Sequence, residues 1–78
     1  MQIDNKVIGK VIRQQRMLKG MTQELLSGLA GIARTHLSMI ENGTKSANFE
    51  TICRISAALE MLPSKLVGLF EAEAGLTD

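Results

Sequence analysis

This chain of 78 residues has few of the side chains on which enzymes and single-strand-binding proteins depend. It contains no Trp or Tyr and only two Phe, which disfavours RNA or unpaired DNA as a ligand, since those bases stack on aromatic rings. One His and one Cys, without paired carboxylates nearby, provide neither a nucleophile with its base nor a zinc ligand set. No glycine-rich loop runs into Lys-Ser or Lys-Thr. We therefore expect no enzymatic activity, no catalytic residue, no cofactor and no metal.

Cysteine and long apolar runs are also scarce. The single Cys53 cannot form an internal disulfide, which is typical of a reducing compartment. Residues 1–4 lack the basic and apolar regions of a signal peptide, and no segment approaches the length of a membrane span. These absences predict a soluble cytoplasmic protein with no membrane partner.

The net charge is only +1, which argues against a general nucleic-acid coat, but the charge is unevenly distributed. Residues 1–45 carry seven basic and three acidic side chains, a net +4. Residues 46–78 carry two basic and five acidic side chains, a net −3. One half can therefore face phosphates while the other faces a partner or solvent, although small domains also show such an imbalance by chance.

Apolar residues recur at helical spacing in five segments, and no segment has the alternating pattern of a strand. Asp4-Asn5, Thr22 and Asn48 are candidate N-caps, and Pro63 is acceptable only at a helix start. A hydrophobic content of 45% is ample for the core of one small domain. The predicted helices cover approximately residues 5–19, 23–30, 34–41, 49–59 and 63–73. The sequence thus predicts a single all-α domain over residues 1–78.

The segment 21–43 is the most informative part of the chain. Gly31 suits the left-handed turn of a short connection between two amphipathic helices. The second of these helices carries a polar outer face formed by Arg34, Thr35, Ser38 and Asn42. A compact helix pair with an exposed polar face fits the major groove of DNA. This pattern predicts double-stranded DNA as the partner.

In these features the sequence resembles the phage Cro/repressor helix-turn-helix family, also called the XRE family, over roughly residues 8–70. The conjunction of Arg16, Gln23, Gly31, Glu41 and Gly43 at these spacings makes the resemblance specific. The wider match comprises Ile8-Gly9, Ile12-Arg13, Thr22-Gln23-Glu24, Leu26, Ala30-Gly31-Ile32, Leu37-Ser38, Ile40-Glu41-Asn42-Gly43 and Leu59. The resemblance implies a compact five-helix domain like that of lambda repressor. Its helix-turn-helix would cover about residues 22–41, with a positioning helix and then a recognition helix.

A narrower resemblance, to restriction–modification controller proteins, comes from the run Arg34 to Ser38, from Glu60 after Leu59, and from the single further apolar helix. It implies a small homodimeric regulator that binds a pseudo-palindromic operator and times endonuclease expression relative to the methyltransferase. RNA polymerase is a further candidate partner of such a regulator. Two alternatives remain open: a phage-like repressor, and a protein-interaction module such as an antitoxin or an adaptor.

The candidate DNA contacts fall into two classes. Side chains at the start of a recognition helix project toward base edges, where Arg can bond guanine and Thr can touch a thymine methyl group. The predicted base-reading residues are Arg34, Thr35, Ser38 and Met39. Phosphates are expected to meet side chains around the two helix ends and the following loop. These predicted backbone-binding residues are Thr22, Gln23, His36, Asn42, Thr44, Lys45 and Ser46.

The family resemblance also implies a largely buried ion pair between Arg16 and Glu41, which would tie the first helix to the recognition helix. Two positions depart from the family pattern. Ala33 stands where the family usually has a capping side chain, so about 1 kcal/mol of cap stabilisation is absent. Glu60 stands where Gly is frequent, which predicts that the turn after the fourth helix is either mildly strained or shaped differently.

The fifth predicted helix has a broad apolar surface, formed by Leu66, Val67, Leu69 and Phe70. Four helices form a thin layer that is not expected to cover all of these side chains, and a small monomer seldom leaves such a patch in water. We therefore predict a dimer interface on these four residues, within the region of about residues 50–73.

Overall fold

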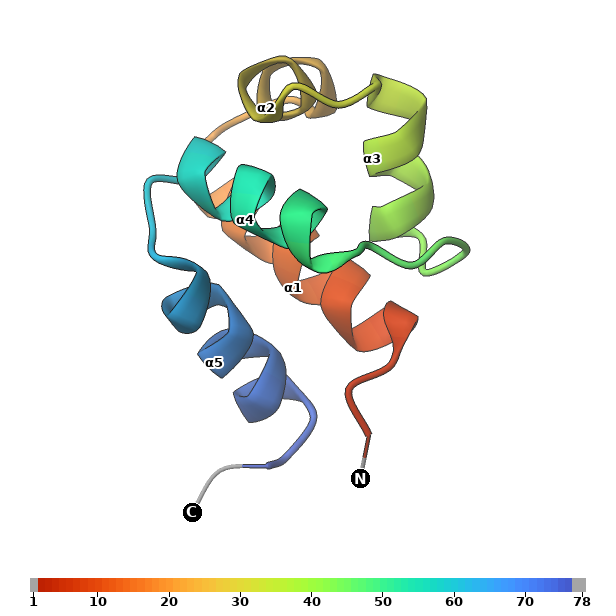
Figure 1. Cartoon of the computed structure of the whole chain (residues 1–78), viewed down its shortest axis with the longest axis vertical. Coiled ribbons are helices and arrows are strands. Elements are labelled where there is room, and N and C mark those ends of the chain that lie inside the picture. Colours follow the sequence, from red (N-terminus) through yellow and green to blue (C-terminus); the bar gives the residue numbers. More distant parts are fainter. Residues whose placement is uncertain (1, 77–78) are drawn as a thin grey trace.

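The computed structural model describes residues 2–76, and within them it contains five α-helices and no strand (Figure 1). The helices are α1 (Asn5–Leu18), α2 (Gln23–Ala30), α3 (Arg34–Glu41), α4 (Phe49–Ala58) and α5 (Pro63–Glu73). The five predicted helices are confirmed, each within one residue of its expected ends. In the described part of the chain, each helix is too short or too polar to cross a membrane.

Three helices begin at a side-chain cap. Asp4 accepts a hydrogen bond from the amide of Val7, Thr22 from that of Leu25, and Asn48 from that of Thr51. The remaining two helices, α3 and α5, have no side-chain cap; α5 instead begins at a proline, whose missing N–H needs no partner. The start of α3 is therefore fixed by the turn before it and by packing.

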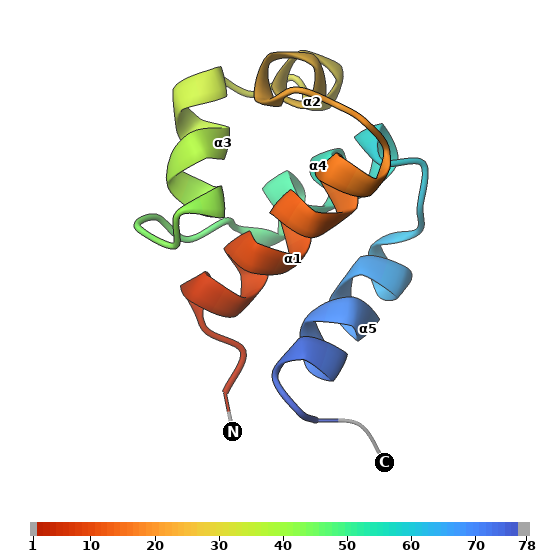
Figure 2. The ribbon, with the colours of Figure 1, turned by 180° about the vertical axis from the view of Figure 1, so that it is seen from behind.

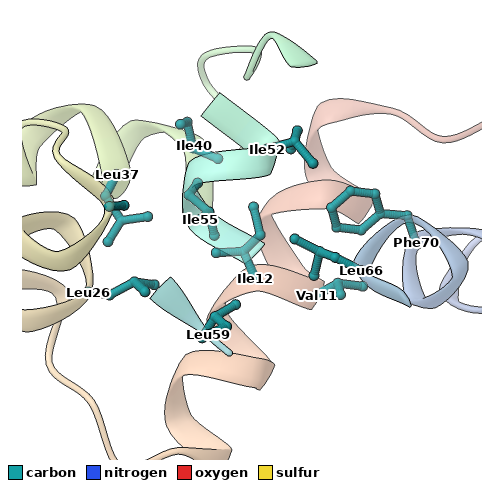
Figure 3. Packing of buried hydrophobic residues seen from close by; sticks show 11 residues of the cluster. Val11, Ile12, Leu26, Leu37, Ile40, Ile52, Ile55, Leu59, Leu66 and Phe70 are labelled. Atoms are coloured by element: carbon teal, nitrogen blue, oxygen red, sulfur yellow. The ribbon is translucent and has the colours of Figure 1, made fainter. Parts of the chain in front are cut away.

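The helices enclose one hydrophobic core, which Figure 3 shows from close by. α1 contacts α3 and α5, α2 contacts α3 and α4, and α4 contacts α5. Seen from either side, the pair α2–α3 occupies one end of the molecule and α5 lies away from α3 (Figures 1 and 2). The core residues include Val11, Ile12, Leu26, Ala30, Leu37, Ile40, Ile52, Ile55, Leu59, Leu66 and Phe70. The helix-turn-helix and the C-terminal helix thus point their outer surfaces in different directions.

The burial of α5 corrects one expectation. Leu66 is 0% exposed and Phe70 is 3% exposed, because α5 packs against both α1 and α4. The prediction that these two side chains form an exposed dimer patch is therefore wrong: they belong to the chain's own core. Val67 and Leu69 are half-buried and keep part of their surface accessible. Any interface on α5 must use these two and their exposed neighbours.

Five residues among 2–76 have left-handed backbone conformations: Gly20, Gly31, Gly43, Glu60 and Gly75. Gly31, between α2 and α3, has φ = 70°, as expected for a helix connection this short. Glu60, after α4, has φ = 59° and is the one residue other than glycine with positive φ among residues 2–76. A side chain in this conformation crowds the following carbonyl group, so the strain predicted at Glu60 is present.

Candidate nucleic-acid interface

Helix α3, the predicted recognition helix, separates into an inward and an outward side. Leu37, Ile40 and Glu41 are buried and attach the helix to the rest of the domain. At about 100° per residue, the opposite side consists of Arg34, Thr35, Ser38, Met39 and Asn42. The four residues predicted to read bases therefore share one arc of one helix.

The outward side chains of α3 are free to bind a ligand. Within residues 2–76, Arg34, Thr35 and Ser38 make no side-chain hydrogen bond to the protein. Arg34 and Thr35 are exposed, Ser38 is half-buried, and Met39 is 44% exposed. The guanidinium group of Arg34 and the hydroxyl groups of Thr35 and Ser38 can form hydrogen bonds with base edges. The apolar side chain of Met39 can contact a thymine methyl group.

The start of α2 presents unpaired backbone donors. The hydroxyl and carbonyl oxygens of Thr22 accept hydrogen bonds from the amides of Leu25 and Leu26, both at 3.0 Å. The amides of Gln23 and Glu24 have no protein partner in the part of the chain that the structure describes. These N–H groups and the positive end of the helix dipole favour an anion such as phosphate.

The loop after α3 carries the other predicted backbone contacts. Lys45 and Ser46 are exposed, and His36 is half-buried on the side of α3. The hydroxyl of Thr44 donates to the carbonyl oxygen of Met39 at 3.2 Å, so its one donor already serves to close the end of the helix. Lys45 is thus the strongest candidate for a phosphate contact in this loop.

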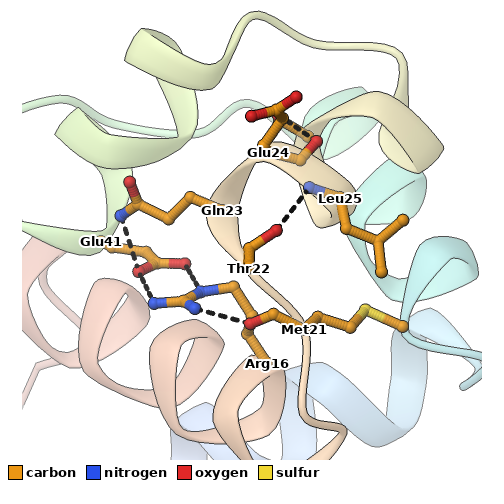
Figure 4. Close-up of polar contacts among 8 residues, drawn as sticks. Arg16, Met21, Thr22, Gln23, Glu24, Leu25 and Glu41 are labelled. Atoms are coloured by element: carbon orange, nitrogen blue, oxygen red, sulfur yellow. Dashed lines mark hydrogen bonds and ion pairs between the residues drawn. The ribbon is translucent and has the colours of Figure 1, made fainter.

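The predicted ion pair between Arg16 and Glu41 is present and nearly enclosed (Figure 4). Arg16 Nε donates to Glu41 Oε2 at 2.8 Å, and Nη2 donates to Oε1 at 3.0 Å. The side chains are 13% and 1% exposed, respectively. The hydrogen bond to Glu41 raises the pKa of the Arg16 guanidinium above its ordinary value, against the opposing effect of burial. This ion pair fixes α3 on α1.

Two further contacts make this ion pair part of a network that the sequence did not reveal. Arg16 Nη1 donates to the carbonyl oxygen of Met21 at 2.8 Å, and Gln23 Nε2 donates to Glu41 Oε1 at 3.1 Å (Figure 4). Gln23 was predicted only as a phosphate contact beside the free amides of α2. The local sequence carries no signal of its bond to Glu41, because the two residues meet only when α2 folds against α3.

Lys6 is another residue of this surface, and the sequence pattern did not indicate it. A Cβ built on Gly43 would lie 2.9 Å from Cγ of Lys6, so the first turn of α1 runs directly beside the loop that follows α3. The Lys6 side chain is exposed there. It places a second cation close to the segment that contains Lys45.

A helix pair joined by a left-handed glycine, with free donors along the second helix and unpaired amides at the start of the first, defines a helix-turn-helix DNA-binding domain. The chain belongs to the helix-turn-helix family HTH_3, whose model matches residues 12–66. This membership confirms the classification made from the motifs. The family comprises DNA-binding transcription regulators, so the chain is not an enzyme.

The chain is similar to a control protein, to a phage protein and to two solved restriction–modification controller proteins. The ImmF control region 10 kDa protein of Bacillus phage phi105 is 32% identical over 59 residues, which cover 76% of this chain and 66% of that protein. Control protein C.BamHI of Bacillus amyloliquefaciens is 37% identical over 62 residues, which cover 78% of this chain and 76% of that protein. The crystal structure of the wild-type controller protein C.Esp1396I superposes with a TM-score of 0.84 at 27% identity and covers 95% of each chain. The controller protein C.AhdI from Aeromonas hydrophila gives a TM-score of 0.77 at 29% identity, over 80% of this chain and 94% of its own. C.Esp1396I has also been solved as a tetramer in complex with its natural operator of 35 base pairs.

Proposed function

We propose that this protein is a homodimeric, sequence-specific transcription regulator that binds a pseudo-palindromic DNA operator in the cytoplasm and controls restriction–modification genes. The observation that carries the proposal is the outward side of α3, where Arg34, Thr35 and Ser38 keep their hydrogen-bonding groups free of protein partners among residues 2–76. The likeness to controller proteins supports the same assignment.

In the proposed complex, α3 enters the major groove and the start of α2 rests on the DNA backbone. Arg34 and Thr35 lead the helix and read base edges, with Ser38 and Met39 one turn further along. Gln23 and the free amides of α2 hold one phosphate, while Lys45 and Lys6 hold another on the far side of α3. Direct base contacts set the sequence preference, and the phosphate contacts set the register.

The proposed dimer forms through the side of α5 that carries Leu69. Leu69 is half-buried, and Leu62, seven residues before it and thus about two turns back on the same side, is 72% exposed. Val67, also half-buried, lies on the other flank of the buried stripe of Leu66 and Phe70 and contributes at the edge of the contact. An isologous contact through this face would relate two copies by a twofold axis. Two recognition helices would then lie about 34 Å apart, in successive major grooves.

Selection of bound sequences from a random duplex pool, with the purified chain alone, tests this proposal. We expect an enriched site made of two inverted half-sites whose centres lie about 10 base pairs apart. Pulldown of RNA polymerase on the selected duplex, with and without the chain, then tests RNA polymerase as a further partner. A pool that shows no enrichment would refute the function and would favour the alternative of a protein-interaction module.

A further inference from the structure

Glu41 lies where three helices meet. It is the last residue of α3, and its carboxylate accepts hydrogen bonds from Arg16 of α1 and from Gln23, the first residue of α2 (Figure 4). The Glu41 side chain is 1% exposed, whereas Gln23 is only half-buried. The buried carboxylate is therefore linked to the surface of the protein through the amide of Gln23.

The amide of Gln23 has two chemically different ends. Its NH₂ group offers two donors, and its carbonyl oxygen only accepts. The terminal torsion of a glutamine is broad and nearly twofold, so an unconstrained side chain presents either end. A DNA phosphate accepts hydrogen bonds and repels a carbonyl oxygen. A contact between Gln23 and phosphate thus requires one defined orientation of the amide.

Glu41 supplies that orientation. Because an ionised carboxylate only accepts, it binds the NH₂ end of Gln23, with Nε2 and Oε1 separated by 3.1 Å. The two hydrogen bonds from Arg16 hold the carboxylate in place. The bond to Glu41 uses one N–H of Gln23, and the other has no protein partner within residues 2–76. This free side-chain N–H and one of the two unpaired backbone amides of α2 therefore belong to the same residue, Gln23.

We infer that Glu41 is a positioning residue for DNA binding, which holds the Gln23 amide with a nitrogen donor ready for a backbone phosphate. The inference rests on the proposed function. Simple electrostatics predicts the opposite effect of removing Glu41, because the loss of a negative charge near phosphates should strengthen DNA binding. Removal of Glu41 should instead weaken it.

Affinity measurements on the full chain, with a fluorescent duplex carrying the selected site, test the inference. All titrations use a temperature at which circular dichroism shows every variant folded. We expect Gln23→Ala to weaken binding about tenfold, as loss of a hydrogen bond to a charged group does. In the background of Glu41→Met, which removes the acceptor, Gln23→Ala should cost less than about twofold, because the amide is no longer oriented.

Arg16→Lys is the matched structural control, since it removes the paired guanidinium hydrogen bonds but keeps a cation beside Glu41, so that the carboxylate can still accept from Gln23. In that background Gln23→Ala should still cost about tenfold. Glu71→Gln controls for charge: this exposed carboxylate of α5, which has no side-chain hydrogen bond in the described part of the chain, should leave affinity unchanged. If Glu41→Met does not fold, Glu41→Gln replaces it. The new side chain has the shape of glutamate, but its amide can donate or accept, so it no longer holds the Gln23 amide in one orientation.

A second readout needs no DNA. The side-chain NH₂ signal of Gln23 in a ¹⁵N spectrum, assigned by its loss in Gln23→Ala, should shift in Glu41→Met and move much less in Arg16→Lys. A signal that Glu41→Met leaves unchanged, or a full tenfold cost of Gln23→Ala in that background, would overturn the inference alone. A native chain that bound no duplex at all would overturn the proposed function and the inference together.

Discussion

The backbone of Gly9 in α1 lies directly against the carbonyl oxygen of Ile40 near the end of α3. A Cβ atom built on Gly9 would collide with this oxygen and with the carbonyl group of Glu41. The two helices can approach this closely only because position 9 has no side chain. Gly9 therefore sets how deeply the recognition helix is seated on the domain.

Gly9→Ala should destabilise the protein by about 1–3 kcal/mol, because the added methyl group meets backbone atoms that cannot rotate away. Gly28→Ala is the matched control: Gly28 lies within α2 and has nothing within 4 Å of a built Cβ. That change should stabilise by about 0.5–1 kcal/mol through helix propensity. Urea denaturation at one protein concentration measures both, and equal stability of the two variants would contradict the packing argument.

The assignment of base readers and phosphate holders predicts two different losses. Arg34→Ala should weaken specific binding by about 1–3 kcal/mol per contacted base and flatten the preference at one position of each half-site. Lys45→Ala should weaken binding to selected and random duplexes alike. It should also reduce the slope of log affinity against log salt concentration by about one per subunit. Titrations of both duplexes at several salt concentrations separate these cases. Identical losses on both duplexes from both variants would show that the division is wrong.

The strained turn after α4 predicts a stabilising substitution. Glu60 has φ = 59°, and its amide donates to the carbonyl oxygen of Ala57 as part of the helix-ending turn. Glu60→Gly removes a conformational cost of about 1 kcal/mol and should raise the melting temperature by several degrees. The same change at Glu71, an exposed position inside α5, should lower it, because glycine weakens a helix by about 1 kcal/mol. A fall in melting temperature for both would refute the strain.

The five helices and their order were predictable from the sequence because their signals are local. The caps at Asp4, Thr22 and Asn48 and the left-handed Gly31 need only neighbouring residues to act. The outward arc of α3 follows from helical periodicity. The ion pair between Arg16 and Glu41 is a long-range contact, and it was predicted only because the sequence resembles a known family.

The remaining contacts depend on how the helices pack, which periodicity does not specify. The apolar spread of α5 was interpreted as an exposed patch, but Leu66 and Phe70 are buried because α5 lies in the angle between α1 and α4. The bond from Gln23 to Glu41 and the approach of Lys6 to Gly43 join segments that are distant in the chain. Each required the tertiary structure.

Breaking the buried ion pair should cost much more than removing an exposed charge. Glu41→Gln leaves the Arg16 guanidinium in a poorly solvated site and should destabilise by about 3 kcal/mol, whereas Glu24→Gln should change stability by less than about 0.5 kcal/mol. The hydrogen bond to Glu41 raises the pKa of Arg16, so the stability that this bond contributes is fully present below the ordinary pKa of a guanidinium group and is lost only at higher pH. Thermal unfolding between about pH 6 and pH 9 should therefore show the same gap between the two variants at every pH. Equal, small effects would mean that Glu41 is solvated.

The proposed interface predicts different outcomes for two leucines of similar exposure. Leu62 is 72% exposed beside the accessible face of α5, and Leu18 is 79% exposed at the end of α1. Leu62→Lys and Leu69→Lys should give folded monomers with weakened operator affinity, since a charge in the apolar contact must be desolvated. Leu18→Lys should remain a dimer.

Phe70→Lys distinguishes this interface from the core, because Phe70 is 3% exposed and a buried lysine there should unfold the chain rather than dissociate it. Analytical ultracentrifugation and circular dichroism on the same samples report association and helix content. A native chain that sediments as a monomer at tens of micromolar, or a dimer that neither Leu62→Lys nor Leu69→Lys disturbs, would place the twofold axis elsewhere. In that case two recognition helices could not be held one turn of DNA apart through α5.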